Sequence, residues 1–85
     1  MIYSEKDILK LVESGCMVRL NLKLRVPVYG KIAKLNDFDD LLSKNMFRFV
    51  MSGRLDAFNE AQTDYRKAEH TKIMSIKEIT YIKEY

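Results

Sequence analysis

The sequence has little of several residues on which common protein chemistries depend. Its 85 residues include one cysteine, one histidine, one proline and three glycines, and there is no tryptophan. The single cysteine, Cys16, cannot form an internal disulfide, which indicates a reducing compartment. We interpret Cys16 as a small apolar residue at the start of a buried strand, because free cysteines are usually buried. A disulfide-stapled scaffold is therefore excluded.

Groups for catalysis and metal binding are also scarce. A metal site needs several converging His, Cys or carboxylate ligands, and His70 and Cys16 lie far apart in the sequence. Asp37, Asp39 and Asp40 lack the glycine and the closing glutamate of a calcium loop, so we interpret them as a solvated turn. Nucleophilic catalysis needs a Ser or Cys beside a base, and three scattered glycines give neither a nucleophile elbow nor a phosphate loop. We predict no enzyme activity, no metal and no cofactor.

Long apolar runs are missing as well. No run approaches the roughly 20 residues that a membrane span needs. The first residues are mixed in charge and do not resemble a signal peptide, so we expect a cytoplasmic protein with no membrane partner. Hydrophobic residues make up 47% and charged residues 32% of the chain. This balance predicts one folded domain over residues 1–85.

The first half of the chain shows two clear periodic patterns. Residues 4–14 have a helical stripe of apolar residues, with Ser4 as a candidate N-cap and Gly15 as a candidate C-cap. Residues 16–26 alternate between apolar and polar residues, as a half-buried strand does. The apolar set of this strand is Val18, Leu20, Leu22, Leu24 and Val26. We predict a helix followed by a strand.

A second strand is expected over 28–35, paired with the first as a hairpin through a kinked connection around 25–29. The apolar phase slips across Gly30, which predicts a β-bulge that bends this strand. Small barrels need such bends to close. Residues 36–40 have the composition of a turn, and 46–51 have that of a third strand. The region 16–52 thus holds strands one to three.

The last third of the chain is predicted with one alternative left open. Apolar residues over 54–69 recur near helical spacing, which predicts a helix of about three turns. The alternative is a long, partly ordered loop. Isoleucines spaced by three over 71–82 predict a strand, a tight 3₁₀ turn at 75–78 and a final strand. The tail after Ile82 is expected to fray.

This order of elements, and the spacing of Gly30, Ile32, Leu35 and Leu41, resembles the Sm-like small β-barrel family. Asn36 stands where that family prefers Asp, and Asp40 stands where it has an RNA-contacting Asn. Met74-Ser75 replaces the Arg-Gly pair of its second motif. The apolar C-terminal strand is also similar to small bacterial YolD-like proteins. The resemblance implies an α+β fold: an N-terminal helix, then a bent five-stranded antiparallel small β-barrel with a helical insert between strands 3 and 4.

Basic residues on the outward side of the first hairpin are the main functional signal. They are interleaved with one aromatic residue, and cations beside an aromatic ring can bind single-stranded RNA or DNA by phosphate contact and base stacking. The predicted nucleic-acid-binding residues are Arg19, Lys23, Arg25, Tyr29, Lys31 and Lys34. The alternative is an ordinary charged solvent face, which protects a sheet from aggregation. The sequence thus favours a non-catalytic binding module.

A protein partner or a homo-oligomer is the second functional hypothesis. The aromatic residues Phe38, Phe47, Phe49, Phe58 and Tyr65 are too many for a small core, so some of them could line an interface. Sm-like rings assemble by pairing edge strands between subunits, and the resemblance implies the same mode here. The alternative is that these aromatics cover the core beneath the insert.

Overall fold

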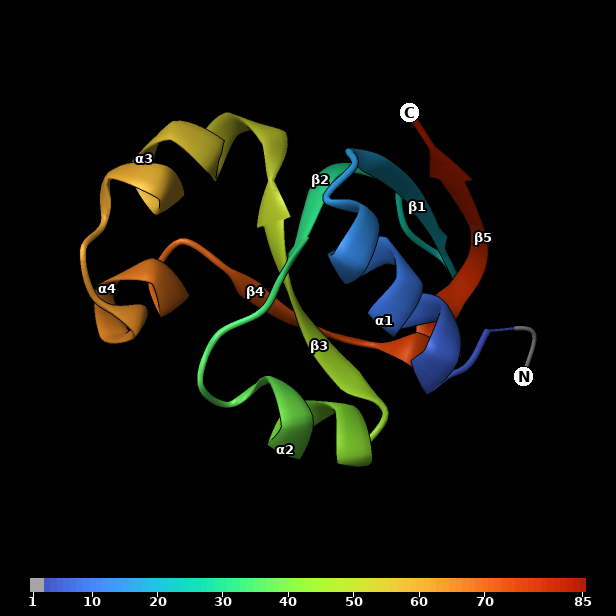
Figure 1. The fold of residues 1–85 in the computed structure, drawn as a ribbon. Coiled ribbons are helices and arrows are strands. Elements are labelled where there is room, and N and C mark those ends of the chain that lie inside the picture. The colour runs from blue at the N-terminus through green and yellow to red at the C-terminus, as the bar shows by residue number, and fades with distance from the viewer. Residues whose placement is uncertain (1–2) are drawn as a thin grey trace.

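The computed structural model describes residues 3–85, which form one α+β unit (Figure 1). In chain order the elements are α1 (Glu5–Ser14), β1 (Val18–Leu22), β2 (Val28–Ala33), α2 (Phe38–Ser43), β3 (Met46–Met51), the 3₁₀ turn η1 (Ser52–Arg54), α3 (Leu55–Glu60), α4 (Asp64–Ala68), β4 (Lys72–Ser75), the 3₁₀ turn η2 (Ile76–Glu78) and β5 (Ile79–Glu84). The described strands make one five-stranded antiparallel sheet in the order β4-β3-β2-β1-β5. The predicted N-terminal helix and five-stranded antiparallel sheet are confirmed.

Helix α1 is bounded by the predicted caps. The Ser4 backbone N–H donates to the Asp7 carboxylate at 2.7 Å, and Gly15, at φ 66°, donates its N–H to the Leu11 carbonyl at 3.2 Å. Ile8 and Leu11 on the inward stripe are buried against the sheet. The Tyr3 hydroxyl also accepts from the Ile82 N–H at 3.0 Å, which ties the start of the chain to β5.

The core lies between α1 and the inner face of the sheet. Its fully buried side chains come from α1, β1, β3 and η2, and the largest are Phe47, Phe49, Ile8, Leu20 and Ile76. Phe38 joins them at 3% exposure. Three of the five aromatics that seemed too many for this core therefore fit inside it.

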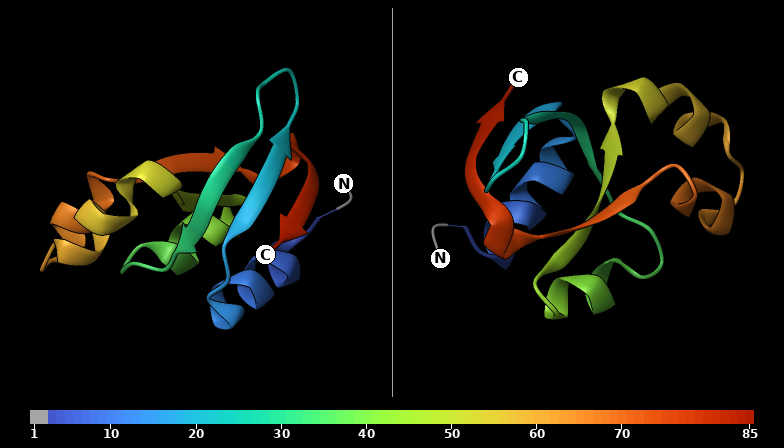
Figure 2. Two further views of the ribbon diagram at one scale, coloured as in Figure 1. Left: turned by 90° about the horizontal axis from the view of Figure 1, so that it is seen from above. Right: turned by 180° about the vertical axis from the view of Figure 1, so that it is seen from behind.

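The sheet is not closed, so the predicted barrel is not confirmed. Among the described residues, β4 pairs only with β3, and β5 pairs only with β1. Turn η2 joins the two edge strands, and they diverge from it in the right-hand view of Figure 2. Closure would require β4 and β5 to lie side by side along their length.

Strand β1 ends earlier than the alternating pattern predicts. Leu22 is its last residue, and Leu24 and Val26 are 105% and 81% exposed instead of facing the core. The chain leaves the sheet because Leu24 adopts a left-handed backbone conformation, at φ 56°. Lys23 and Arg25 consequently belong to a projecting loop, and the hairpin connection is 23–27 instead of 25–29.

The β-bulge predicted at Gly30 is also wrong. Gly30 pairs in regular register with Val18 on one side and Met51 on the other. The register shift lies in β1, between Asn21 and Leu22 where this strand meets β5. The phase slip in the sequence arises because β2 ends at Ala33, so Leu35 lies beyond the strand.

Residues 36–40 contain more than the expected turn. Phe38 begins the short helix α2, which places Phe38, Leu41 and Leu42 on one buried side. The segment between β3 and β4 is helical, as predicted, but it consists of two short helices, α3 and α4, instead of one. Thr63 begins α4 as its N-cap, and its hydroxyl accepts from the Arg66 N–H at 3.2 Å. The last strand continues to Glu84, two residues beyond the predicted boundary at Ile82.

One charged cluster joins α2, β3 and the end of the insert. Arg48 Nε and Nη2 donate to the two Asp37 carboxylate oxygens at 3.1 and 2.7 Å, and Nη1 donates to the Thr71 hydroxyl at 3.0 Å. That hydroxyl in turn donates to the Ala68 carbonyl at 2.8 Å, at the end of α4. The hydrogen bonds and the charge of Arg48 hold the pKa of Asp37 below its ordinary value of 3.8.

A first prediction concerns Gly30. A Cβ placed on this residue would lie 1.8 Å from the backbone carbonyl oxygen of Val50. Because the obstructing atom is backbone, Gly30→Ala should lower the free energy of unfolding by roughly 2–4 kcal/mol in urea titrations. Gly53→Ala is the matched control, since a Cβ there meets nothing within 4 Å. Equal stability of the two variants would contradict this close approach.

A second prediction concerns the pH dependence of stability. A depressed folded-state pKa means that Asp37 stabilises the fold above its ordinary pKa, and that this stabilisation is lost as the pH falls through the folded value. Asp37→Asn should therefore cost roughly 1–2 kcal/mol at neutral pH. The difference from wild type should shrink below about pH 4. Asp40→Asn, which breaks an exposed pair with Lys44, is the control and should change little. A pH-independent difference would contradict the assignment.

Candidate nucleic-acid interface

The sheet face opposite α1 exposes a row of polar side chains across three strands. Alternation in β1 sends Val18, Leu20 and Leu22 into the core and turns Arg19 and Asn21 outward. Residues directly opposite in antiparallel strands share a face. Arg19 is opposite Tyr29 in β2 and Lys83 in β5, so these three residues form one row.

Rows on either side of this one add two more tyrosines. Asn21 is opposite Tyr81. At the other end, the Tyr85 N–H donates to the Met17 carbonyl at 2.9 Å, which continues the pairing of β5 with the chain before β1. The Tyr29 and Tyr85 ring centroids are 6.3 Å apart, and Lys83 Nζ lies 5.4 Å from the Tyr85 ring centre. We call the set Arg19, Asn21, Tyr29, Tyr81, Lys83 and Tyr85 the outer face.

The outer face combines exposed aromatic rings with unsatisfied polar atoms. Tyr29, Tyr81 and Tyr85 are 47%, 50% and 60% exposed. Arg19 Nε and Asn21 Oδ1 are shielded from solvent and have no hydrogen-bond partner among the described residues. These two atoms lie beneath the surface of the face, so the groups that it presents to a ligand are the tyrosine rings and the Lys83 ammonium group.

The face is small. Adjacent strands are about 4.8 Å apart, so the row from β2 to β5 spans about 10 Å, and the four residue steps from Tyr81 to Tyr85 span about 13 Å. The left-hand view of Figure 2 shows β2, β1 and β5 side by side with no helix over them on this side. A surface of this size fits a few nucleotides or a short peptide.

The residues predicted from sequence are only partly brought together. Arg19 and Tyr29 are opposite each other on the outer face, and Lys31 is the next outward residue of β2. Lys34 lies beyond the end of β2, with its Nζ 5.8 Å from the Phe38 ring centre. Lys23 and Arg25 lie in the β1–β2 loop.

Sequence reasoning missed the contribution of β5. Tyr81, Lys83 and Tyr85 supply two of the three rings and one of the cations, but the C-terminal tail was expected to fray. The available signal was the alternation of Tyr81, Lys83 and Tyr85, which gives period two in a segment that ends in aromatics.

A groove borders the outer face where β2 meets the insert. It encloses about 320 Å³ and has an apolar lining that includes Val50, Leu55 and Phe58, with Lys31, Lys34 and Lys67 among its charged residues. Lys67 Nζ donates to the Phe58 carbonyl at 2.9 Å and lies 4.7 Å from the Phe58 ring centre, so this cation already has protein partners. Lys31 lines the groove and also follows Tyr29 along the outward side of β2.

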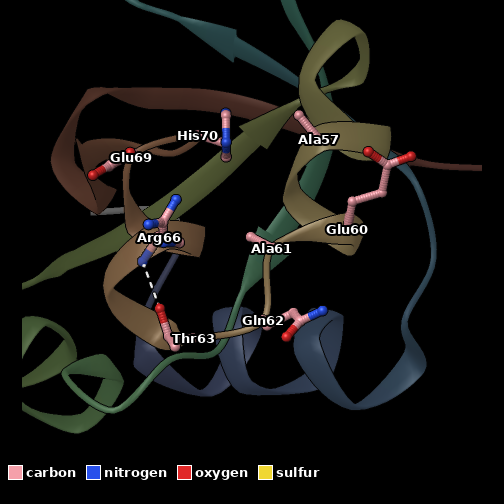
Figure 3. A pocket seen from close by; sticks show the side chains of 8 residues that line it. All are labelled: Ala57, Glu60, Ala61, Gln62, Thr63, Arg66, Glu69 and His70. Atoms are coloured by element: carbon pink, nitrogen blue, oxygen red, sulfur yellow. Dashed lines mark hydrogen bonds between the residues drawn. The ribbon is translucent and has the colours of Figure 1, made fainter.

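A larger cavity of about 510 Å³ lies between α3 and α4 (Figure 3). Its charged residues do not converge, because Glu60 and Glu69 stand on opposite sides and Arg66 projects between the helices. Within residues 3–85, no group of three or more His, Cys, Asp or Glu residues could hold a metal ion. This cavity lacks the convergent groups of a catalytic or metal centre.

No protein-family model, curated protein or solved structure matches the chain. In the part of the chain that the structure describes, no helix combines the length and the apolar character needed to cross a membrane.

Proposed function

We propose that this protein is a non-catalytic module that binds single-stranded nucleic acid on its outer face. The observation that carries the proposal is the row of Tyr29, Arg19 and Lys83, flanked by Tyr81 and Tyr85. Exposed rings on either side of β1, from β2 and from β5 with its C-terminal end, offer stacking platforms for bases, and the cations between them offer contacts to phosphates.

The charge distribution supports an anionic ligand. Between Glu13 and Asp37 the sequence contains no acidic residue, whereas it contains five Lys and Arg residues. This stretch includes β1, β2 and the loop between them. The hairpin is thus the basic part of a chain whose net charge is +3, and it supplies Arg19, Asn21 and Tyr29 to the outer face.

The Sm-like resemblance remains a proposal for the fold, supported by the N-terminal helix, the antiparallel strands and the 3₁₀ turn before β5. In this resemblance, the positions that contact RNA in the Sm-like family correspond to Asp40 and to Met74-Ser75 of this chain. Met74 is buried at 7% exposure, and Ser75 accepts from the Lys77 N–H as the cap of η2. Asp40 is an acidic residue in α2. These positions do not suit a phosphate or a base, so the outer face is the better location for a nucleic acid.

A test is titration of short single-stranded RNA and DNA with the wild-type protein. Binding should weaken with salt, with a slope of about −0.7 in log affinity against log salt for each phosphate contacted. Tyr29→Ala and Tyr85→Ala should each cost roughly 1–3 kcal/mol of binding free energy. Tyr65→Ala is the matched control, because Tyr65 is an 80% exposed tyrosine on α4, away from the outer face.

A charge variant completes this test. Lys31→Gln combined with Lys83→Gln should reduce both the affinity and the salt slope, whereas Lys72→Gln, an exposed cation on β4, should not. Titrations that stay flat at low salt with both RNA and DNA would exclude the proposal. Equal losses with Tyr65→Ala and Tyr29→Ala would also contradict the assigned location.

A protein partner or self-association by strand addition is the second candidate, favoured by the position of β4 and β5 at the two edges of the described sheet. The β5 edge is partly occupied, since its Ile82 N–H already donates to Tyr3. The β4 edge, at Lys72–Ser75, is the shorter one. Sedimentation that shows a mass rising with concentration, together with flat oligonucleotide titrations, would favour this candidate over nucleic-acid binding.

A further inference from the structure

The β1–β2 loop, which we define as residues 23–27, exposes apolar side chains at the end of the hairpin. Leu24 is 105% exposed and Val26 is 81% exposed, the two highest values among the exposed large hydrophobic residues of the described chain. The left-hand view of Figure 2 shows this loop projecting beyond the strands that it connects. Pro27 closes the loop just before β2 and restricts its backbone.

The backbone of the loop carries a second unfavourable feature at the same position. Leu24 has φ 56°, a left-handed conformation that glycine or asparagine adopts readily and that a bulky side chain adopts rarely. The fold therefore holds a large apolar side chain in a strained conformation and fully in water. Strain of this kind recurs at sites that bind another molecule.

Cations alternate with the apolar residues of the loop. Lys23 and Arg25 are exposed and flank Leu24 in sequence. The loop lies within the stretch between Glu13 and Asp37 that has no acidic residue. The base of the loop is tied to η2, where the backbone carbonyl of the half-buried Glu78 accepts from the Lys23 N–H at 2.9 Å. The tip is thus both apolar and positively charged.

The shape of the loop selects the kind of partner. A stable protein interface buries at least about 1,200 Å² in total and needs a complementary surface. A narrow convex tip with two apolar side chains cannot supply that area. A bilayer accepts apolar side chains without a matching pocket, and anionic headgroups attract adjacent cations. Lys and Arg can keep their charged ends at the headgroups while neighbouring apolar side chains enter more deeply.

We propose that the β1–β2 loop docks the protein on the surface of an anionic phospholipid bilayer. Leu24 and Val26 enter the boundary between headgroups and acyl chains, and Lys23 and Arg25 contact the lipid phosphates and carboxylates. The sequence predicts no membrane partner because a spanning segment is missing. Contact through a loop needs no such segment.

The first experiment measures flotation of the protein with vesicles of phosphatidylcholine containing phosphatidylserine, and with vesicles of phosphatidylcholine alone. The wild-type protein should float with the anionic vesicles and only weakly with the neutral ones. Leu24→Asn combined with Val26→Ser should weaken this binding by about tenfold or more. Asparagine tolerates the left-handed conformation, so the loop backbone is retained. Tyr65→Ser, which removes an exposed apolar group elsewhere, should leave vesicle binding unchanged.

The second experiment uses the absence of tryptophan from the chain. Leu24→Trp gives a single fluorophore at the loop tip, and its emission should shift to shorter wavelength when anionic vesicles are added. Tyr65→Trp is the control and should show no shift. Lys23→Gln and Arg25→Gln should each reduce vesicle affinity by roughly fivefold, whereas Lys10→Gln, an exposed cation on α1, should not.

The proposal is overturned if the wild-type protein does not float with anionic vesicles, or if the Leu24→Asn, Val26→Ser variant floats equally well. An unshifted emission of the Leu24→Trp variant on vesicles that bind it would overturn it too. The Leu24→Asn, Val26→Ser double variant keeps Lys23, Arg25 and the whole outer face, so it should bind oligonucleotides as the wild type does. Failure of the membrane proposal is therefore distinguishable from failure of nucleic-acid binding.

Discussion

The close approach of β2 and β3 at Gly30 is the constraint on which the arrangement of the sheet depends. The Val50 carbonyl oxygen occupies the space in which any other residue would place its Cβ. Regular pairing of Gly30 with Val18 and Met51 then sets the register of the three central strands. That register turns Tyr29 and Lys31 outward and Ile32 toward the core. A residue without a side chain thus determines where the functional side chains lie.

The same register divides the outward side of the sheet into two halves. Val50 is opposite Lys31, yet it is 1% exposed, because it lies in the groove lined by Leu55 and Phe58 of the insert. Hydrogen bonds fix the insert in this position, from Arg48 to Thr71 and from the Asn36 N–H to the Asp64 carboxylate. The half formed by β2, β1 and β5 is left open, and the exposed Tyr29, Tyr81 and Tyr85 lie there.

The sequence allowed prediction of the elements whose signals are local. The caps of α1, the strand Met46–Met51 and the 3₁₀ turn before β5 follow from residue type and spacing within a few positions. The apolar pattern along the chain led to wrong predictions where tertiary contacts determine the end of a strand or the role of a residue. Leu24 continues the apolar alternation of residues 16–26. The strand nevertheless ends at Leu22, and Leu24 adopts a left-handed backbone conformation in the loop that follows. Gly30 was correctly singled out, although the reason is the Val50 carbonyl and not a bulge.

The candidate site was only half predictable because it joins residues far apart in the chain. Arg19 and Tyr29 belong to one hairpin, so their proximity follows from local pairing. Lys83 reaches the same row only because β5 pairs with β1, which is a contact across more than sixty residues that no local pattern reports. Lys23 and Arg25 are the opposite case. Their closeness to Arg19 in sequence predicts that they belong to the same face, but the turn at Leu24 places them in the β1–β2 loop.

The two groups of cations, Arg19 with Lys83 and Lys23 with Arg25, thus occupy different surroundings. Arg19 and Lys83 lie among tyrosine rings on the open side of the sheet, where planar bases can stack. Lys23 and Arg25 lie beside aliphatic side chains on a projecting tip, where a planar ligand has no platform. Similar charges on one hairpin can therefore serve different anionic partners, and the neighbouring apolar residues decide which.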